Sequence, residues 1–125
     1  MVRDSTQRIG IVAEQLAFRF LRREGLKPVC RNFRSRRGEI DLIMLDNECL
    51  VFVEVRYRTD ASFVKAALTV DSRKQRKLAC AASMFLSMNR TFGSRVCRFD
   101  VVGVDRDSEG ETSIDWIQDA FRPGM

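Results

Sequence analysis

The fold of this 125-residue chain is decided by one stretch, EIDLIMLDNECLVFVEVRY, at residues 39–57. Large apolar and β-branched residues fill its two halves, 39–45 and 50–57, and only the polar residues 46–49 separate them. Two such segments joined by a short polar connection indicate a β-hairpin. We therefore expect two adjacent antiparallel strands in the middle of the chain.

The register of this hairpin brings two acids together. A turn centred on residues 47 and 48 would place Asp41 opposite Glu54, on the same face and with β-carbons about 5 Å apart. Opposed carboxylates repel each other unless a cation lies between them, and Mg²⁺ prefers oxygen ligands of this kind. The hairpin thus predicts a metal site, for Mg²⁺ or Mn²⁺, held by Asp41 and Glu54.

A purely structural interpretation of the same charges stays open. The expected register also places Glu39 opposite Arg56, where the two could form a cross-strand ion pair. Asp41 and Glu54 would then be solvated carboxylates at one end of the sheet. A one-residue slip of the register would separate the two acids onto opposite faces.

Helical and extended patterns flank the hairpin. Apolar residues recur with helical spacing from about Thr6 to Glu24, and Gly25 suits the end of that helix. Ser72 and Gln75 resemble a capping box that opens a second helix through about Met88, with apolar positions Leu78, Ala81, Ala82 and Phe85. Strands are expected at 26–33, 98–104 and 113–117, and an irregular loop at 58–71. Pro28 favours an edge position for the first of these strands.

Together these elements predict an α/β fold in which helices flank a central mixed β-sheet of about five strands. The length suits one domain, and we expect it to span residues 1–125. The first helix contributes a third acid, because Glu14 lies at the border of its buried face. A helix crossing the hairpin could direct Glu14 toward the same metal, although an acid at such a border is more often simply solvated.

Positive charge is concentrated in two blocks. The net charge of the chain is +5, but residues 1–37 carry +7 and residues 73–98 carry +7, whereas 38–72 and 99–125 are acidic. Two basic blocks around a carboxylate pair favour a polyanionic partner such as DNA. The residues expected to contact nucleic acid are Arg31, Arg36, Arg37, Lys74, Gln75 and Lys77. Ordinary solvated faces are the competing explanation for this charge pattern.

The histidine and cysteine content of the chain limits the kinds of catalytic site it can form. The chain contains no histidine, which excludes histidine metal ligands and Ser-His or Cys-His catalytic pairs. Its four cysteines are widely spaced and form no CxxC pair, so we interpret them as small buried apolar residues. No apolar segment is long enough for a membrane span, and residues 1–8 resemble no signal peptide, which predicts a cytoplasmic protein with no membrane partner.

Several motifs in combination resemble the YraN family of bacterial proteins. These are GEIDLI at 38–43, VFVEVRYR at 51–58 and RFDVV at 98–102, together with the helix carrying Glu14 and the pair Arg31-Asn32. The similarity covers essentially the whole chain. YraN proteins are grouped with restriction-endonuclease-like folds and Holliday junction resolvases, so the resemblance implies that fold and a PD-(D/E)XK-type nuclease site.

The resemblance also implies a role for each site residue. Glu14 would be the helical acid, Asp41 the metal-binding aspartate and Glu54 the second metal-binding acid. Arg56 stands where the nuclease motif has a lysine, and Lys74 matches a helical lysine of the family. This substitution matters because a lysine can help to deprotonate the attacking water, whereas arginine stays protonated and can only stabilise negative charge.

We therefore expect a Mg²⁺-dependent endonuclease that cleaves phosphodiester bonds in DNA, with branched DNA among its candidate substrates. An alternative is a non-catalytic nucleic-acid-binding module on the same fold, with a site that Arg56 has weakened. A third is a structural or partner-docking protein. Formation of a homodimer is compatible with all three.

Overall fold

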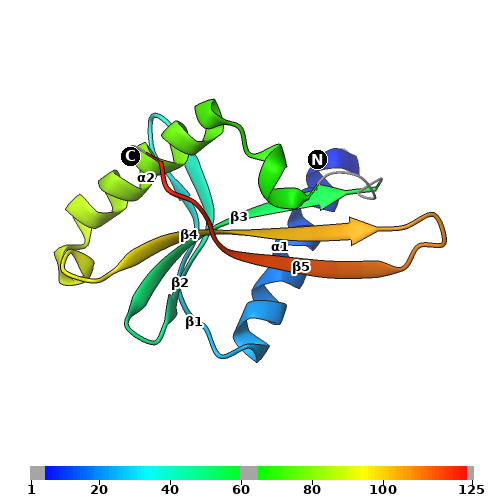
Figure 1. The fold of residues 1–125 in the computed structure, drawn as a ribbon, viewed down its shortest axis with the longest axis horizontal. Helices are drawn as coiled ribbons and strands as arrows, with labels where there is room; N and C mark the ends of the chain where they lie inside the picture. Colours follow the sequence, from blue (N-terminus) through cyan, green and yellow to red (C-terminus); the bar gives the residue numbers. More distant parts are fainter. Residues whose placement is uncertain (1–4, 60–64, 124–125) are drawn as a thin grey trace.

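The computed structural model describes residues 5–59 and 65–123. Two α-helices and five strands form an α/β fold around one sheet (Figure 1). The elements are α1 (Ser5–Arg23), β1 (Lys27–Arg34), β2 (Glu39–Asp46), β3 (Cys49–Arg58), the 3₁₀ turn η1 (Ala66–Thr69), α2 (Ser72–Met88), the 3₁₀ turn η2 (Arg90–Phe92), β4 (Cys97–Arg106) and β5 (Thr112–Phe121).

The strands lie in the order β1-β2-β3-β4-β5. All neighbours are antiparallel except β3 and β4, which are parallel because α2 connects them. This five-stranded mixed sheet flanked by helices confirms the predicted fold class and is consistent with a restriction-endonuclease-like fold. The edge position predicted for the strand containing Pro28 is also confirmed, since β1 borders only β2.

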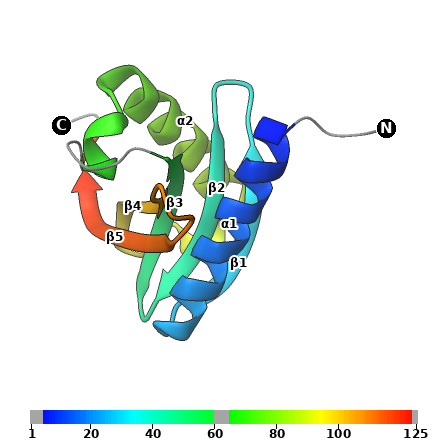
Figure 2. The same cartoon turned by 90° about the vertical axis from the view of Figure 1, so that its right-hand side faces the viewer.

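The two helices cover opposite faces of the sheet, as Figure 2 shows. Ala13, Ala17 and Leu21 of α1 pack on one face, where Leu42 and Val53 belong to the same buried cluster. The predicted apolar positions of α2 pack on the other face, in a cluster that also contains Ile43 and Phe52. Burial of these two stripes holds both helices on the sheet.

The end of α1 follows the expected pattern. Gly25 has a φ of +99°, a left-handed conformation that favours glycine, and its N–H donates to the Arg22 carbonyl at 3.0 Å. The N–H of the buried Leu26 donates to the Leu21 carbonyl at 3.0 Å. These two bonds form a Schellman motif that turns the chain from α1 into β1.

The start of α2 differs from the prediction. Asp71, not Ser72, caps the helix, because its carboxylate accepts a hydrogen bond from the Lys74 N–H at 2.8 Å. The Gln75 amide donates instead to the Val70 carbonyl at 3.0 Å. A carboxylate at this position also interacts favourably with the helix dipole, which explains why the aspartate one residue earlier takes the role.

Two further expectations need correction. The last strand, β5, extends well beyond the predicted 113–117, because a bulge near Asp119, whose φ is +51°, lets it continue to a pair between Phe121 and Phe99. The cysteines are free thiols but none is fully buried, and Cys97 is exposed near the start of β4. Residues 60–64 of the predicted loop lie outside the described residues. Within the described part of the chain, no helix is long and apolar enough to cross a membrane.

Candidate active site

Three carboxylates meet at one end of the β2–β3 hairpin. Glu14 from α1, Asp41 from β2 and Glu54 from β3 form what we call the carboxylate cluster. Burial and a hydrogen bond with the Asp41 side chain raise the pKa of Glu14 to about 7. Burial and then the adjacent Asp41 side chain raise the pKa of Glu54 to about 8. Asp41 therefore lies close enough to Glu14 and to Glu54 to oppose the ionisation of each.

An irregularity in β2 lets acids from opposite faces of the sheet meet. Ile40 packs in the cluster under α2, whereas Leu42 packs in the cluster under α1, although residues two apart in a regular strand share a face. The alternation breaks at Asp41, and Asn32, across from it in β1, has a φ of +54°. Asp41 can thus contact both Glu14, on the α1 side, and Glu54, on the α2 side.

The hairpin register is confirmed, but it stops just before the acids. Cα partners run from Asp46–Cys49 to Leu42–Val53, which is the predicted alignment. Beyond that pair the Asp41 Oδ2 accepts a hydrogen bond from the backbone N–H of Val55 at 2.8 Å. The side chain of Asp41 therefore bonds to β3 where the ladder of Cα partners has ended.

This ending of the ladder rules out one predicted contact. The expected register placed Glu39 opposite Arg56, and the structural interpretation made them an ion pair, but the ion pair of Glu39 is with Arg34 of β1, at 3.8 Å between Oε1 and Nε. The prediction assumed that β2 and β3 stay paired to their ends. Arg56 instead faces Glu54 on its own strand, with 4.0 Å between Nη2 and Oε2.

Glu54 is the most buried member of the carboxylate cluster, with 5% of its surface exposed. Its Oε2 lies 3.5 Å from the Lys74 Nζ but has no hydrogen-bond partner among the described residues. The Arg56 Nε is buried and unpartnered in the same way. A buried carboxylate oxygen without a donor costs free energy, which a cation bound at this position would offset.

The donors at this site fit a hard cation. Asp41 and Glu54 offer oxygen ligands, and Oε2 of Glu54, which accepts no hydrogen bond from the described residues, could bind the ion beside its ion pairs with Lys74 and Arg56. Within residues 5–59 and 65–123, no three Asp, Glu or Cys side chains are arranged to hold a metal ion together. Mg²⁺ does not need three, because it commonly binds through one or two carboxylates while substrate phosphates and water complete its shell.

The residues predicted to contact nucleic acid fall into two groups. Arg36 and Arg37 are exposed in the β1–β2 turn, which Figure 2 shows next to α2. A Cβ on Gly38 would lie 2.6 Å from the Lys77 carbonyl oxygen, so the absence of a side chain lets this turn pack against α2. The exposed Lys77 therefore lies close to the two arginines, and we call these three residues the hairpin patch.

The other predicted contacts lie apart from the hairpin patch. Arg31 lies on the α1 side, with its guanidinium 4.3 Å from the ring centre of Phe18. Lys74 contacts Glu54 within the site itself. Gln75 is half-buried and donates to the backbone of Val70, so its position suggests a structural role at the start of α2.

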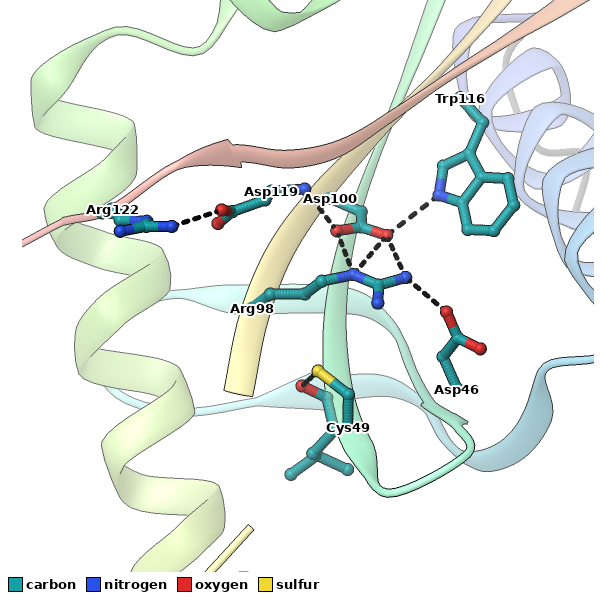
Figure 3. A network of polar contacts seen from close by, with 8 residues as sticks. Asp46, Cys49, Arg98, Asp100, Trp116, Asp119 and Arg122 are labelled. Carbon is teal, nitrogen blue, oxygen red and sulfur yellow. Dashed lines mark hydrogen bonds and ion pairs between the residues drawn. The ribbon is translucent and has the colours of Figure 1, made fainter. Parts of the chain in front are cut away.

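A buried polar network that the sequence analysis missed lies on the α1 side of the sheet (Figure 3). Asp100 is fully buried and accepts hydrogen bonds from Arg98 Nε at 3.0 Å, Trp116 Nε1 at 2.9 Å and the Asp119 N–H at 2.9 Å. Arg98 also donates to Asp46 at 2.9 Å. The signal was present, because Arg98 and Asp100 are two apart in an apolar strand and share a face. This network holds β4, β5 and the β2–β3 turn together.

Comparison with known proteins identifies the family. A UPF0102 protein of Pseudomonas fluorescens is 42% identical over 121 residues, which cover 97% of this chain and 98% of that protein. A UPF0102 protein of Pseudomonas aeruginosa is 44% identical over 120 residues, covering 95% and 96% of the two chains. The model of the family described as "Uncharacterised protein family UPF0102" matches residues 13–104, which include the whole carboxylate cluster. This chain therefore belongs to the UPF0102 family.

Proposed function

We propose that this protein is a metal-dependent nuclease that cleaves phosphodiester bonds in DNA, with a site of the PD-(D/E)XK type. The observation that carries the proposal is the carboxylate cluster, in which three elements bring acids together around a buried and unpartnered oxygen of Glu54. Clusters of acids with strongly perturbed pKa values are typical of functional sites. The resemblance to the YraN family supports the same function.

Asp41 and Glu54 would hold the metal, Mg²⁺ or Mn²⁺. Such an ion polarises a scissile phosphate and lowers the pKa of a bound water. The main-chain bond from Val55 to Asp41 keeps one ligand in place before any cation binds. Glu14 would be the third carboxylate of the site. It would also accept a proton, since its pKa of about 7 lies near the working pH.

Two cations next to Glu54 would act on the substrate. Arg56 would stabilise the negative charge that develops on the phosphate, because a guanidinium stays protonated. Lys74 supplies the ammonium group that the nuclease motif places at position 56. Its Nζ lies 3.5 Å from Glu54 Oε2, closer than the 4.0 Å of Arg56, although it comes from α2 rather than β3. A lysine from another element can thus serve where Arg56 cannot.

The hairpin patch supports nucleic acid as the substrate. Its positive charges lie on the α2 side of the sheet, the side on which Lys74 contacts Glu54. Contacts from such side chains to phosphates give affinity without sequence specificity, so the proposal includes linear and branched DNA.

A non-catalytic binding module is the second candidate. Arg56 in place of the lysine favours it, as does the absence, among the described residues, of three acids arranged around one ion. Such a module would bind DNA through the same positive charges without cleaving it.

A cleavage assay separates these functions. Labelled linear, flap and four-way DNA would be incubated with wild type, Asp41→Asn or Asp115→Asn in Mg²⁺, Mn²⁺ or EDTA. Asp115 is an exposed acid of the edge strand β5 and serves as the matched control. We expect metal-dependent cleavage by wild type and by Asp115→Asn. The cleavage rate of Asp41→Asn should be lower by about 100-fold or more. Even residues that only hydrogen-bond to metal ligands typically contribute about 10–100-fold to metal affinity or activity. Binding without cleavage of any substrate would establish the module instead.

A further inference from the structure

A second concentration of positive charge lies along the C-terminal half of α1. Four arginines, with Gln15 and Phe18, line a cavity of about 510 Å³ between α1 and β1. We call this cavity the arginine groove, and its arginines are Arg19, Arg22, Arg23 and Arg31. Only Arg31 was among the residues expected to contact nucleic acid.

The arginines of the arginine groove are not held in ion pairs with acids of the described residues. All four arginines are exposed, and within the described part of the chain none of them forms an ion pair with an acidic side chain. Like charges held together destabilise the surface that carries them, so the groove suits a ligand with several negative charges. A nucleic-acid backbone, with a phosphate at every nucleotide, is such a ligand.

Phe18 positions two of the guanidinium groups. Arg31 lies over its ring with 4.3 Å to the ring centre, and Arg22 lies 5.7 Å from the same centre. Cation–π contacts of this kind fix the direction of a guanidinium, whose planar donors match phosphate oxygens. Because guanidinium groups already contact the ring, the groove is suited to phosphates rather than to stacking of a base.

The groove continues from the carboxylate cluster. Glu14, Phe18 and Arg22 recur every four residues, so they follow one stripe along α1. Arg31 lies near enough to Glu14 for its charge to favour the ionised carboxylate. With a rise of 1.5 Å per residue, Arg22 lies about 12 Å along the helix axis from Glu14, a separation that a few consecutive phosphates of one strand can span.

We propose that the arginine groove binds the phosphate backbone of DNA a few nucleotides from the phosphate that reaches the carboxylate cluster. The position relative to cleavage rests on the proposed function, whereas phosphate binding in the groove does not. Together with the hairpin patch on the other side of the sheet, the groove makes DNA contact the protein on both sides of the carboxylate cluster.

The test is DNA binding in EDTA, where no cleavage occurs. Fluorescence anisotropy with a labelled duplex would be measured over a salt series for wild type, Arg22→Ala, Arg22→Lys and Arg90→Ala. Arg90 is an exposed arginine of η2 and controls for the loss of one positive charge. Alanine suits a helix interior, so Arg22→Ala should fold, as a thermal melt will check.

We expect Arg22→Ala to weaken binding about 3–10-fold and to lower the slope of log affinity against log salt by about one. Arg22→Lys should keep the slope, because it keeps the charge, and Arg90→Ala should behave like wild type. Equal affinity and slope for Arg22→Ala and Arg90→Ala would overturn the proposal. So would loss of binding by Arg22→Ala to phosphatidylglycerol vesicles but not to DNA, since the groove would then bind a membrane surface.

The outcome is independent of the nuclease proposal. If wild type cleaves no DNA but Arg22→Ala binds it more weakly than Arg90→Ala, the groove is a phosphate site and the proposed enzyme is wrong. If wild type cleaves DNA while Arg22→Ala binds like Arg90→Ala, the enzyme stands and the groove proposal fails.

Discussion

The carboxylate of Asp41 accepts a hydrogen bond from the backbone N–H of Val55, with 2.8 Å between the two atoms. This contact joins β2 to β3 just beyond their last Cα pair, Leu42–Val53. Asp41 is therefore fixed by the main chain, and it needs no cation to hold its position between Glu14 and Glu54. Groups fixed before a ligand binds lose little entropy when it does.

Two substitutions of Asp41 distinguish the effect of its charge on stability from the effect of its hydrogen bond with Val55. Asp41→Asn keeps an oxygen that can accept from Val55 and removes the carboxylate that opposes the ionisation of Glu14 and Glu54. We expect the free energy of unfolding to stay unchanged or to rise by up to about 1 kcal/mol. Asp41→Leu leaves the Val55 N–H without its partner and should lose about 1–3 kcal/mol. Urea unfolding measures both, and an unfolded Asp41→Asn protein would show that the acid is structural.

Stability should depend on pH because burial, and then the neighbouring Asp41, raise the pKa values of Glu14 and Glu54. Glu14 and Glu54, with pKa values of about 7 and about 8, retain protons in the folded protein where the unfolded chain, at 4.5, has lost them. Unfolding therefore releases protons between about pH 4.5 and 8, and the free energy of unfolding should fall as the pH rises through this range.

Urea unfolding at several pH values without metal would measure this decline. The chain contains no histidine, so no imidazole titrates in the same range. Glu54→Gln should flatten the decline, and Mg²⁺ should reduce it by favouring the ionised acids. A wild-type stability that is constant or rises from pH 5 to 8 would contradict the close contact of these carboxylates.

Much of the fold follows from the sequence because local patterns determine it. The period of the apolar residues fixed both helices, and the short polar turn aligned the β2–β3 hairpin correctly. The register predicted that Asp41 and Glu54 come close, but not the break in alternation at Asp41 that lets it contact acids on both faces of the sheet. The contribution of Glu14 was a weaker inference, because the position of α1 over the hairpin depends on tertiary packing.

Other features depend on contacts that no local pattern contains. The ladder of Cα partners ends at Leu42–Val53, where Asp41 bonds to Val55, so Glu39 and Arg56 do not become cross-strand partners. Lys74 reaches Glu54 from a helix twenty residues later in the sequence. The arginine groove lies between α1 and β1. The arginines of α1 can be read from the sequence, but their position next to Arg31 depends on how α1 packs against β1.

The roles of Lys74 and Arg56 can be tested by substituting each residue. If Lys74 supplies the ammonium that position 56 lacks, Lys74→Met should lower metal-dependent cleavage about 100-fold, within the range for loss of one group that stabilises a transition state. Arg56→Lys should keep or raise cleavage, because a lysine there restores the motif. Single-turnover rates measure both effects, with melting temperatures as the control for folding. Full cleavage by Lys74→Met would remove this lysine from the mechanism.

The buried network around Asp100 should affect stability alone. Asp100→Asn removes the charge that Arg98 contacts and one of the two acceptor oxygens, Oδ2 for Trp116 Nε1 and Oδ1 for the Asp119 N–H. We expect the free energy of unfolding to fall by about 1–3 kcal/mol. Metal binding by the folded variant should be unchanged, since the network lies on the α1 side of the sheet, away from Glu54. Loss of metal binding at full stability would place Asp100 in the site.

The central claim is that the carboxylate cluster binds a divalent cation through Asp41 and Glu54. Calorimetric titration of Mn²⁺ into wild type and Asp41→Asn at pH 8, with and without duplex DNA, tests it most directly. We predict that wild type binds Mn²⁺, more tightly with DNA, and releases protons as Glu14 and Glu54 ionise, while Asp41→Asn shows no such binding. Equal binding of Mn²⁺ by both proteins, or no binding by wild type even with DNA, would contradict the account.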